Sequence, residues 1–301
     1  MGASSSEQPD LAPPAEPWGT PSASVPPVPW AEAPVRRRRF WWFLLLLGLT
    51  IWSTTSVYGA AYSVSILAIL GAHEMGHYLA CRYYRVDASL PYFLPMPIIA
   101  TGTLGAFIRI RDQIPGKRAL FDIGIAGPIA GFLVAIPILM VGVHLSEVVP
   151  IEPGILWLGE PLLLKAAVWL VHGSLPDGYT IATHPIAFAA WFGLLATAIN
   201  LFPIGQLDGG HLTYAVFGPR STQITIAGVA ALVGLSFVSS AWIAWAVMTT
   251  VMLFALGPRH PRTTDEDVPL DVPRLWLAAF ALLMLIVCFT PVPIEFLDLV
   301  E

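Results

Sequence analysis

Long apolar runs limit what this chain can fold into more than any other feature of its sequence. Several stretches are each about 20 residues long and largely apolar, the length at which a helix crosses the hydrocarbon core of a bilayer. These stretches are 40–59, 62–82, 119–144, 184–204, 222–238, 239–257 and 274–292. Over the whole chain 56% of residues are hydrophobic and 12% are charged, whereas soluble domains have about 25% charged residues. The sequence therefore predicts an integral membrane protein.

The charges beside these runs predict an orientation. Residues 1–39 are rich in proline and end in Arg36–Arg39, directly before the first run. Because such a segment buries too little apolar surface to offset the entropy of ordering, we expect 1–39 to be a disordered tail and 40–301 a polytopic membrane domain. Arginine and lysine concentrate on the cytoplasmic side, so the tail is expected there, together with the basic residues at 81–85 and 109–118. We expect a multi-pass protein of the cell membrane.

One apolar segment leaves the topology open. Residues 154–172 are long enough to span a bilayer but contain Glu160, Pro161 and Lys165. If this segment crossed the membrane, every later element would be inverted. We expect an interfacial or re-entrant helix on the outer side, which keeps the basic residues after position 257 in the cytoplasm.

The second apolar run contains the sequence HEMGH at residues 73–77. Positions i and i+4 of a helix lie on one face about 6 Å apart along the axis, so His73 and His77 present imidazoles that can bind one metal ion. Glu74 follows the first histidine and is placed to act as a general base. This is the physical content of the H-E-x-x-H pattern, in which the two histidines bind zinc.

Histidines in apolar helices are more often hydrogen-bonded core residues than metal ligands. An ionisable residue near mid-membrane costs about 2.5–3.5 kcal/mol, however, and three occur together here. Structural zinc sites bind with apparent free energies of about 10–16 kcal/mol, which offsets such a cost. Metal binding therefore explains the placement better than packing does, with zinc favoured over another divalent ion by the ligand type.

A hydrolytic zinc site needs three protein ligands and one open position. Asp208, in the sequence NLFPIGQLDGGH, is the acidic residue most closely joined to an apolar run. The remaining histidines are also candidates for the third ligand: His144, His172, His184, His211 and His260. From the residues alone the third ligand stays open, with Asp208 and His211, which lies one helical turn later, as the main candidates.

Two motifs together resemble the site-2 protease family of intramembrane zinc metalloproteases. That family carries HExxH followed by NxxPxxxLDG, and both patterns are complete here in the family's order, with the resemblance covering about 62–217. The resemblance implies that His73, His77 and Asp208 hold one Zn²⁺ ion, that Glu74 is the base, and that Asn200 positions the substrate or the developing oxyanion.

The chain departs from some members of that family. No polar segment after residue 35 is long enough for an inserted PDZ domain, and we expect no C-terminal regulatory domain. We therefore expect a short form of the family, with its catalytic core at about 62–217.

The segment between the second and third runs predicts a short β region. Residues 101–111, TGTLGAFIRIR, alternate glycine and β-branched residues without helical periodicity, which suits a small sheet dipping into the membrane from the cytoplasm. An ordinary basic loop is the alternative. The resemblance implies a strand region that captures substrate by adding a strand. In the next run, small residues in 121–132 allow close helix packing, and Asp122 is expected to anchor the helix N-terminus.

The predicted fold is an all-α polytopic membrane protein with about six to seven transmembrane helices around an intramembrane zinc site and this short β region. The predicted function is zinc-dependent hydrolysis of peptide bonds within or next to transmembrane segments of membrane proteins, with the bilayer and a transmembrane protein substrate as partners. Nucleic acid is excluded, because the basic residues cluster beside apolar runs. A catalytically silent relative that binds membrane segments and a metal transporter remain alternatives; a transporter should show ligands along a path, whereas these converge. The oligomeric state is not readable from the sequence.

Overall fold

The structure is a computed structural model that describes residues 33–97, 101–151, 156–257, 263, 265 and 268–296. The chain divides into two units, Met1–Arg39 and Phe40–Glu301, and every element except the first part of α1 belongs to the second. Most of the predicted tail lies outside the described residues. Residues 33–39 are helical, because arginine favours helices and Pro34 is tolerated in a first turn.

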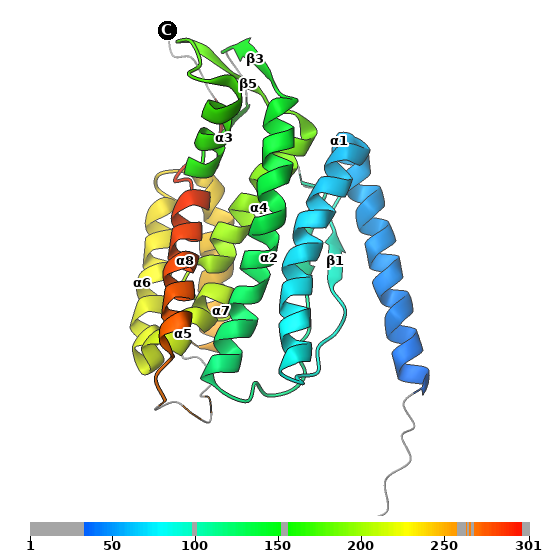
Figure 1. The fold of residues 1–301 in the computed structure, drawn as a ribbon, viewed down its shortest axis with the longest axis vertical. Helices are drawn as coiled ribbons and strands as arrows, with labels where there is room; N and C mark the ends of the chain where they lie inside the picture. The colour runs from blue at the N-terminus through cyan, green and yellow to red at the C-terminus, as the bar shows by residue number, and fades with distance from the viewer. Residues whose placement is uncertain are drawn as a thin grey trace, which may run out of the picture. The chain divides into compact units, whose positions relative to one another are not determined.

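Helix α1, Ala33–Tyr83, consists of two arms joined at Gly59. Gly59 has φ 82° and ψ 176°, a conformation that residues with a side chain rarely adopt. The arm after Gly59 therefore runs back in the opposite direction from the bend (Figure 1). The apolar runs predicted at 40–59 and 62–82 correspond to these two arms.

Helix α2, Lys117–His144, is the central helix of the core. It packs against α4, Pro185–Leu201, and α5, Asp208–Phe217. It also contacts the second arm of α1 very closely, because a Cβ added at Gly76 would lie 2.3 Å from the carbonyl oxygen of Ala126. The close packing predicted for the small residues of 121–132 is thus confirmed.

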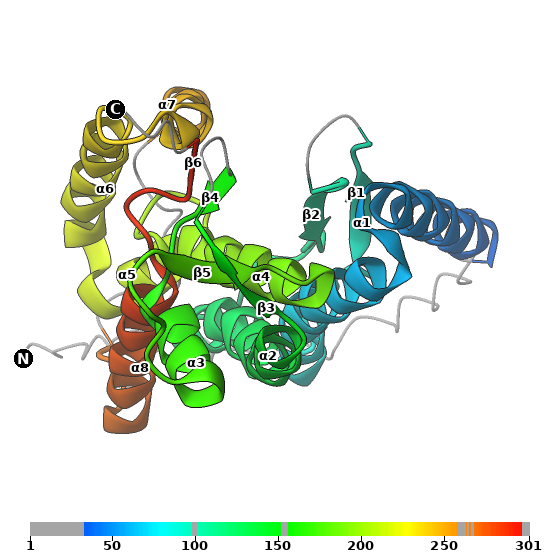
Figure 2. The same ribbon diagram turned by 90° about the horizontal axis from the view of Figure 1, so that it is seen from above.

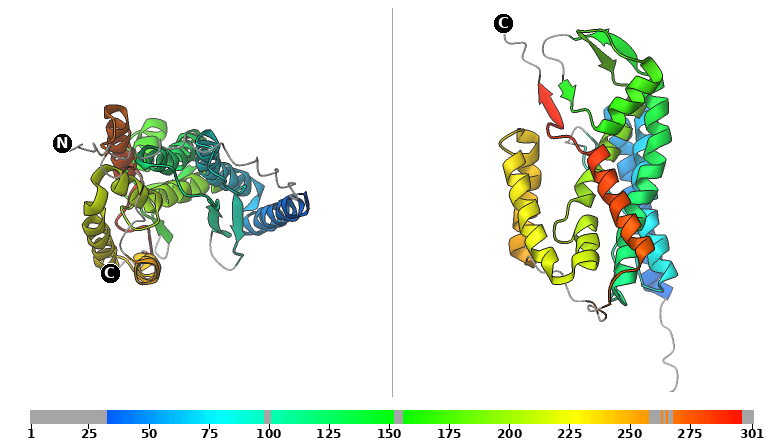
Figure 3. Two further views of the ribbon diagram at one scale, coloured as in Figure 1. Left: turned by 90° about the horizontal axis from the view of Figure 1, so that it is seen from below. Right: turned by 60° about the vertical axis from the view of Figure 1, so that its left-hand side comes forward.

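The later helices are shorter. They are α3, Leu162–His172; α6, Ser221–Leu235; α7, Ile243–Leu256; and α8, Val272–Cys288, with 3-10 turns at Gly218–Arg220 and Ser240–Trp242. Helices α6 and α7 lie side by side at one flank of the core (Figures 2 and 3).

Two helical segments among the described residues are long and apolar enough to cross a membrane, Phe40–Tyr83 and Lys117–His144. The other apolar helices in that search have 10–17 residues. The fold therefore supports membrane association, whereas the predicted total of six to seven spans is not established by helix length.

Within the described parts of the chain, three two-stranded antiparallel sheets accompany the helices. They pair β1, Tyr92–Pro95, with β2, Thr103–Phe107; β3, Glu147–Pro150, with β5, Tyr179–Ala182; and β4, Leu156–Leu158, with β6, Ile294–Phe296. The first sheet confirms that a β region follows the HExxH helix. The other two correct the all-α prediction, because strands of three or four residues have no periodicity long enough to detect.

Helix α3 lies within 154–172, the segment whose topology the sequence left open. It has 11 residues, so it extends about 16 Å, roughly half the hydrocarbon thickness of a bilayer. It lies with β3 and β5 at one end of the helices, opposite the start of α2 (Figure 1). Helix α3 alone is therefore too short for a full crossing, and the interfacial or re-entrant course of 154–172 stays a prediction.

The β1–β2 hairpin is anchored to both arms of α1. The hydroxyl of Ser53, in the first arm, donates a hydrogen bond of 2.7 Å to the carbonyl of Gly102. The hydroxyl of Tyr62, in the second arm, donates one of 2.8 Å to the carbonyl of Thr101. The end of β2 that follows the turn is thereby held near the bend of α1, and residues at its other end line a cavity together with His73 and His77. Figure 2 shows the hairpin beside α1.

Candidate metal centre

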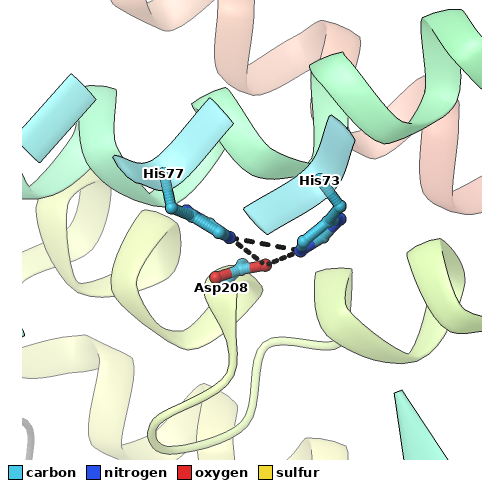
Figure 4. Close-up of side chains that lie close together, drawn as sticks. All are labelled: His73, His77 and Asp208. Carbon is cyan, nitrogen blue, oxygen red and sulfur yellow. Dashed lines mark hydrogen bonds and ion pairs between the residues drawn. The ribbon is translucent and has the colours of Figure 1, made fainter. Parts of the chain in front are cut away.

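The structure brings three of the predicted residues together at one point. His73 and His77 project from the second arm of α1, and Asp208 is the first residue of α5 (Figure 4). Their facing atoms form a nearly equilateral triangle: His73 Nε2 lies 3.2 Å from His77 Nε2 and 3.2 Å from Asp208 Oδ2, and His77 Nε2 lies 3.3 Å from that oxygen. Both histidines are buried.

This triangle fits zinc. A tetrahedral zinc ion with bonds of about 2.0–2.1 Å holds its ligand atoms about 3.3–3.4 Å apart, and two imidazole nitrogens with one carboxylate oxygen form a donor set typical of hydrolytic zinc sites. Among the described residues, these three form the group of histidine, cysteine and acidic side chains that could hold a metal ion. The donor atoms are therefore already at metal-binding separations.

The orientation of His77 is fixed from the opposite side of its ring. Its Nδ1 lies 2.7 Å from the carbonyl oxygen of Ile123 in α2, so Nδ1 carries the proton and Nε2 presents a lone pair to the cluster. The ring fits against α2 only because position 127 is glycine. A Cβ added at Gly127 would lie 2.1 Å from His77 Nε2.

We expect Gly127→Ala to weaken zinc binding at least about 10-fold, because the added methyl group displaces the His77 ring from its ligand position. Zinc dissociation in the presence of a chelator measures the effect. Gly234→Ala is the matched control, since a Cβ at that helical glycine meets no atom within 4 Å. Equal zinc retention in both variants would contradict the packing argument.

Asp208 owes its position to the two glycines that follow it. A Cβ at Gly209 would lie 2.1 Å from the carbonyl oxygen of Leu201, and one at Gly210 would lie 2.2 Å from that of Gly205. The loop after α4 therefore folds directly onto the start of α5. This contact explains in physical terms why the aspartate is followed by small residues.

Glu74 faces a cavity of about 250 Å³ beside the triangle. Its side chain is buried, and the backbone of Ile108 hydrogen-bonds its carboxylate. Asn200, near the end of α4, places its amide nitrogen 3.3 Å from His73 Nε2 and lines the same cavity. Both residues predicted to take part in chemistry therefore adjoin the candidate ligands.

The other histidines lie elsewhere or outside the cluster. His211 lines the cavity but is not one of the three clustered donors. His172 contacts the carbonyl of Val143, and His184 caps α4 by accepting from the backbone N–H of Ile186. His144 ends α2, and His260 lies outside the described residues.

Sequence patterns did not reveal all of the cavity. Its wall includes Ala106, Phe107 and Ile108 at the end of β2, with Gln206 before Asp208. The β pattern of 101–111 located this segment but not its register against Glu74. The carbonyl of Ile123 could not have been predicted, because any helical residue supplies one.

A second cavity lies among α3, α4, β4 and β5 and contains none of the predicted site residues. Its volume is about 470 Å³, and its charged lining residues are Glu160 and Lys165, which form an exposed ion pair of 3.7 Å. Such a pair supplies neither a metal site nor a buried base. The smaller cavity is therefore the one lined by the predicted site residues.

Comparison with known proteins identifies the family. The model of peptidase family M50 matches residues 61–241, which is more than half of the chain and includes both motifs. This chain belongs to peptidase family M50.

Relatives in this family carry metalloprotease names. The chain is similar to the probable zinc metalloprotease EGY2, chloroplastic, of Oryza sativa subsp. indica, with 32% identity over 80% of this chain and 43% of the relative. It is 35% identical to the probable zinc metalloprotease EGY1, chloroplastic, of Arabidopsis thaliana, over 52% of this chain and 29% of the relative. The chain thus spans less than half the length of these relatives. No solved structure matched it.

Proposed function

We propose that this member of family M50 is a zinc-dependent endopeptidase that cleaves peptide bonds within or next to transmembrane segments. The observation that carries the proposal is the triangle of His73, His77 and Asp208, with separations of 3.2–3.3 Å, beside the buried carboxylate of Glu74. The metalloprotease names of the relatives support the same activity. The site lies on an apolar helix long enough to cross a membrane, which supports an intramembrane substrate.

The residues take distinct roles in this proposal. His73, His77 and Asp208 hold the ion, and the hydrogen bond from His77 Nδ1 to Ile123 keeps its ring in the ligating tautomer. A bound zinc ion supplies Lewis acidity, which polarises the substrate carbonyl and makes an attacking water more acidic. Glu74 accepts the proton of that water on a carboxylate oxygen and returns it to the leaving amine. Asn200 donates from its amide to the substrate.

The cavity limits the conformation in which a substrate can reach Glu74. A cavity of about 250 Å³ offers little room for a helix about 10–12 Å in diameter, which favours an extended conformation of the cleaved segment there. Ala106, Phe107 and Ile108 form the wall where β2 ends. An extended substrate that pairs with β2 would therefore pass directly in front of the carboxylate.

The proposed topology is multi-pass, with the N-terminus and the active-site side in the cytoplasm. The basic clusters at 81–85 and 109–118 lie at the end of α1 and just before and within the start of α2, and such residues concentrate on the cytoplasmic side of a membrane. We propose the cell membrane as the location.

A panel of single-span substrates tests the function. The full chain is placed in vesicles and assayed untreated, after chelation, and after zinc is added back. The substrates are tagged single spans, with or without a helix-breaking pair of residues near the cytoplasmic end. Zinc-dependent cleavage of the helix-broken spans is expected. Zinc uptake and substrate capture without cleavage of any span would favour the silent membrane-segment binder, and zinc flux across sealed vesicles would favour the transporter.

A further inference from the structure

The start of α2 is held by residues that lie far along the chain. Helix α2 begins after Gly116, and no side chain of its own caps it. The backbone N–H of Lys117 instead donates a 2.7 Å hydrogen bond to Asp265, and the Lys117 ammonium group donates one of 3.0 Å to the carbonyl of Val268. The connection between α7 and α8 thus supplies the cap that α2 lacks.

Arg274, in the first turn of α8, completes this attachment. Its Nε and Nη2 atoms donate hydrogen bonds of 2.8 and 2.5 Å to the two carboxylate oxygens of Asp122. Asp271 also accepts from Arg274, and the hydroxyl of Tyr84, directly after α1, donates to Asp122. Burial and the hydrogen bond to Asp122 raise the pKa of Tyr84, so this hydroxyl remains a donor. The starts of α2 and α8 lie side by side in Figure 3, right.

Asp122, which Arg274 holds, is next in sequence to the residue that orients the candidate ligand His77. Asp122 directly precedes Ile123, whose carbonyl oxygen lies 2.7 Å from His77 Nδ1. A bidentate arginine–carboxylate pair fixes both the position and the direction of the backbone that carries the carboxylate. The contacts therefore run without a gap from α8, through Asp122 and Ile123, to the ring of His77.

We propose that Arg274 is a positioning residue of the metal centre, which acts by fixing the start of α2 and, through it, the ring of His77. The inference rests on the proposed function for its metal. It assigns a role to α8, which lies beyond the residues 61–241 that the family model matches. Asp122, expected from the sequence to anchor its own helix, is in this interpretation the receiving half of a long-range pair.

The test compares zinc dissociation in Arg274→Gln, Arg274→Lys and Arg118→Gln with that of the unaltered full chain. Arg118 is the matched control, because its Nε also lies near Asp271 Oδ2, at 3.9 Å, whereas the described side chains that bind the Asp122 carboxylate are Arg274 and Tyr84. Arg274→Gln should release zinc to a chelator about 10–100-fold faster, the usual consequence of losing a partner that orients a ligand. Arg274→Lys, which keeps the charge but not the bidentate pair, should be intermediate, and Arg118→Gln unchanged.

A spectroscopic measurement separates positioning from general destabilisation. The absorption of the cobalt-substituted protein depends on the ligand geometry, so it should change in Arg274→Gln and remain unchanged in Arg118→Gln. If Arg274→Gln does not fold, Arg274→Lys provides the comparison. Wild-type zinc dissociation and cobalt absorption in a folded Arg274 variant would overturn the proposal.

These readouts do not depend on peptide cleavage. Suppose that Arg274→Gln weakens zinc binding but the unaltered chain cleaves none of the substrate panel. This result would support the positioning role and reject the proposed peptidase. Cleavage that persists together with unaltered zinc release in the variant would do the reverse. No zinc uptake by the unaltered chain would overturn both.

Discussion

Replacing Glu74 by glutamine should lower the rate of peptide cleavage about 10²–10⁴-fold, the usual contribution of a positioned general base. Glutamine has the same shape but cannot accept a proton. Because Glu74 is not one of the three clustered donors, bound zinc should remain at the wild-type level. Single-turnover cleavage of one substrate from the panel, with zinc quantified in the same preparation, measures both quantities.

Glu160→Gln is the control for the Glu74 substitution. It makes the same chemical change at the larger cavity, where Glu160 is partly exposed and paired with Lys165. Its cleavage rate should match that of the unaltered chain. Undiminished cleavage by Glu74→Gln would remove Glu74 from the mechanism, and loss of zinc in that variant would assign it a ligand role instead.

Asp208→Asn should have the largest effect on metal content. The substitution removes the only negatively charged donor of the triangle and leaves two neutral imidazoles whose nitrogens are 3.2 Å apart. Losing a residue that only orients a metal ligand lowers metal affinity by up to roughly 100-fold. Losing a ligand itself should lower zinc affinity by more than this, and we expect cleavage to disappear with the zinc. Chelator competition measures the affinity.

Asp177→Asn serves as the control for the aspartate substitution, because Asp177 is exposed in the connection before β5. Its zinc affinity should equal that of the unaltered chain. If Asp208→Asn also retained full affinity, His211, which lines the cavity one turn later, would become the candidate for the third ligand.

The proximity of the two histidines could be predicted from the sequence because its determinants are local. His73 and His77 are four residues apart on one helix, so their convergence follows from helix geometry alone. Asp208 was assigned through the paired motifs, because no spacing rule brings residue 208 to residue 77. The structure explains that convergence by backbone contacts at Gly209 and Gly210.

The arrangement of the helices was harder to predict, because apolar content does not define where a helix bends or stops. The run 184–204 contains α4, which ends at Leu201, and α5 begins separately after the loop that includes Gly205. The sheets at β3–β5 and β4–β6 were missed because their strands are so short. The pair of Arg274 and Asp122 joins positions 152 apart in sequence, and no local pattern marks such partners.

The order of elements along the chain has a consequence for biosynthesis. A nascent chain that has been synthesised as far as α7 already contains both histidines, Glu74 and Asp208, but not Arg274. The donors of the metal centre are therefore made before the helix that holds the start of α2. If Arg274 holds the start of α2 as we propose, the metal centre gains this support only once α8 has been synthesised.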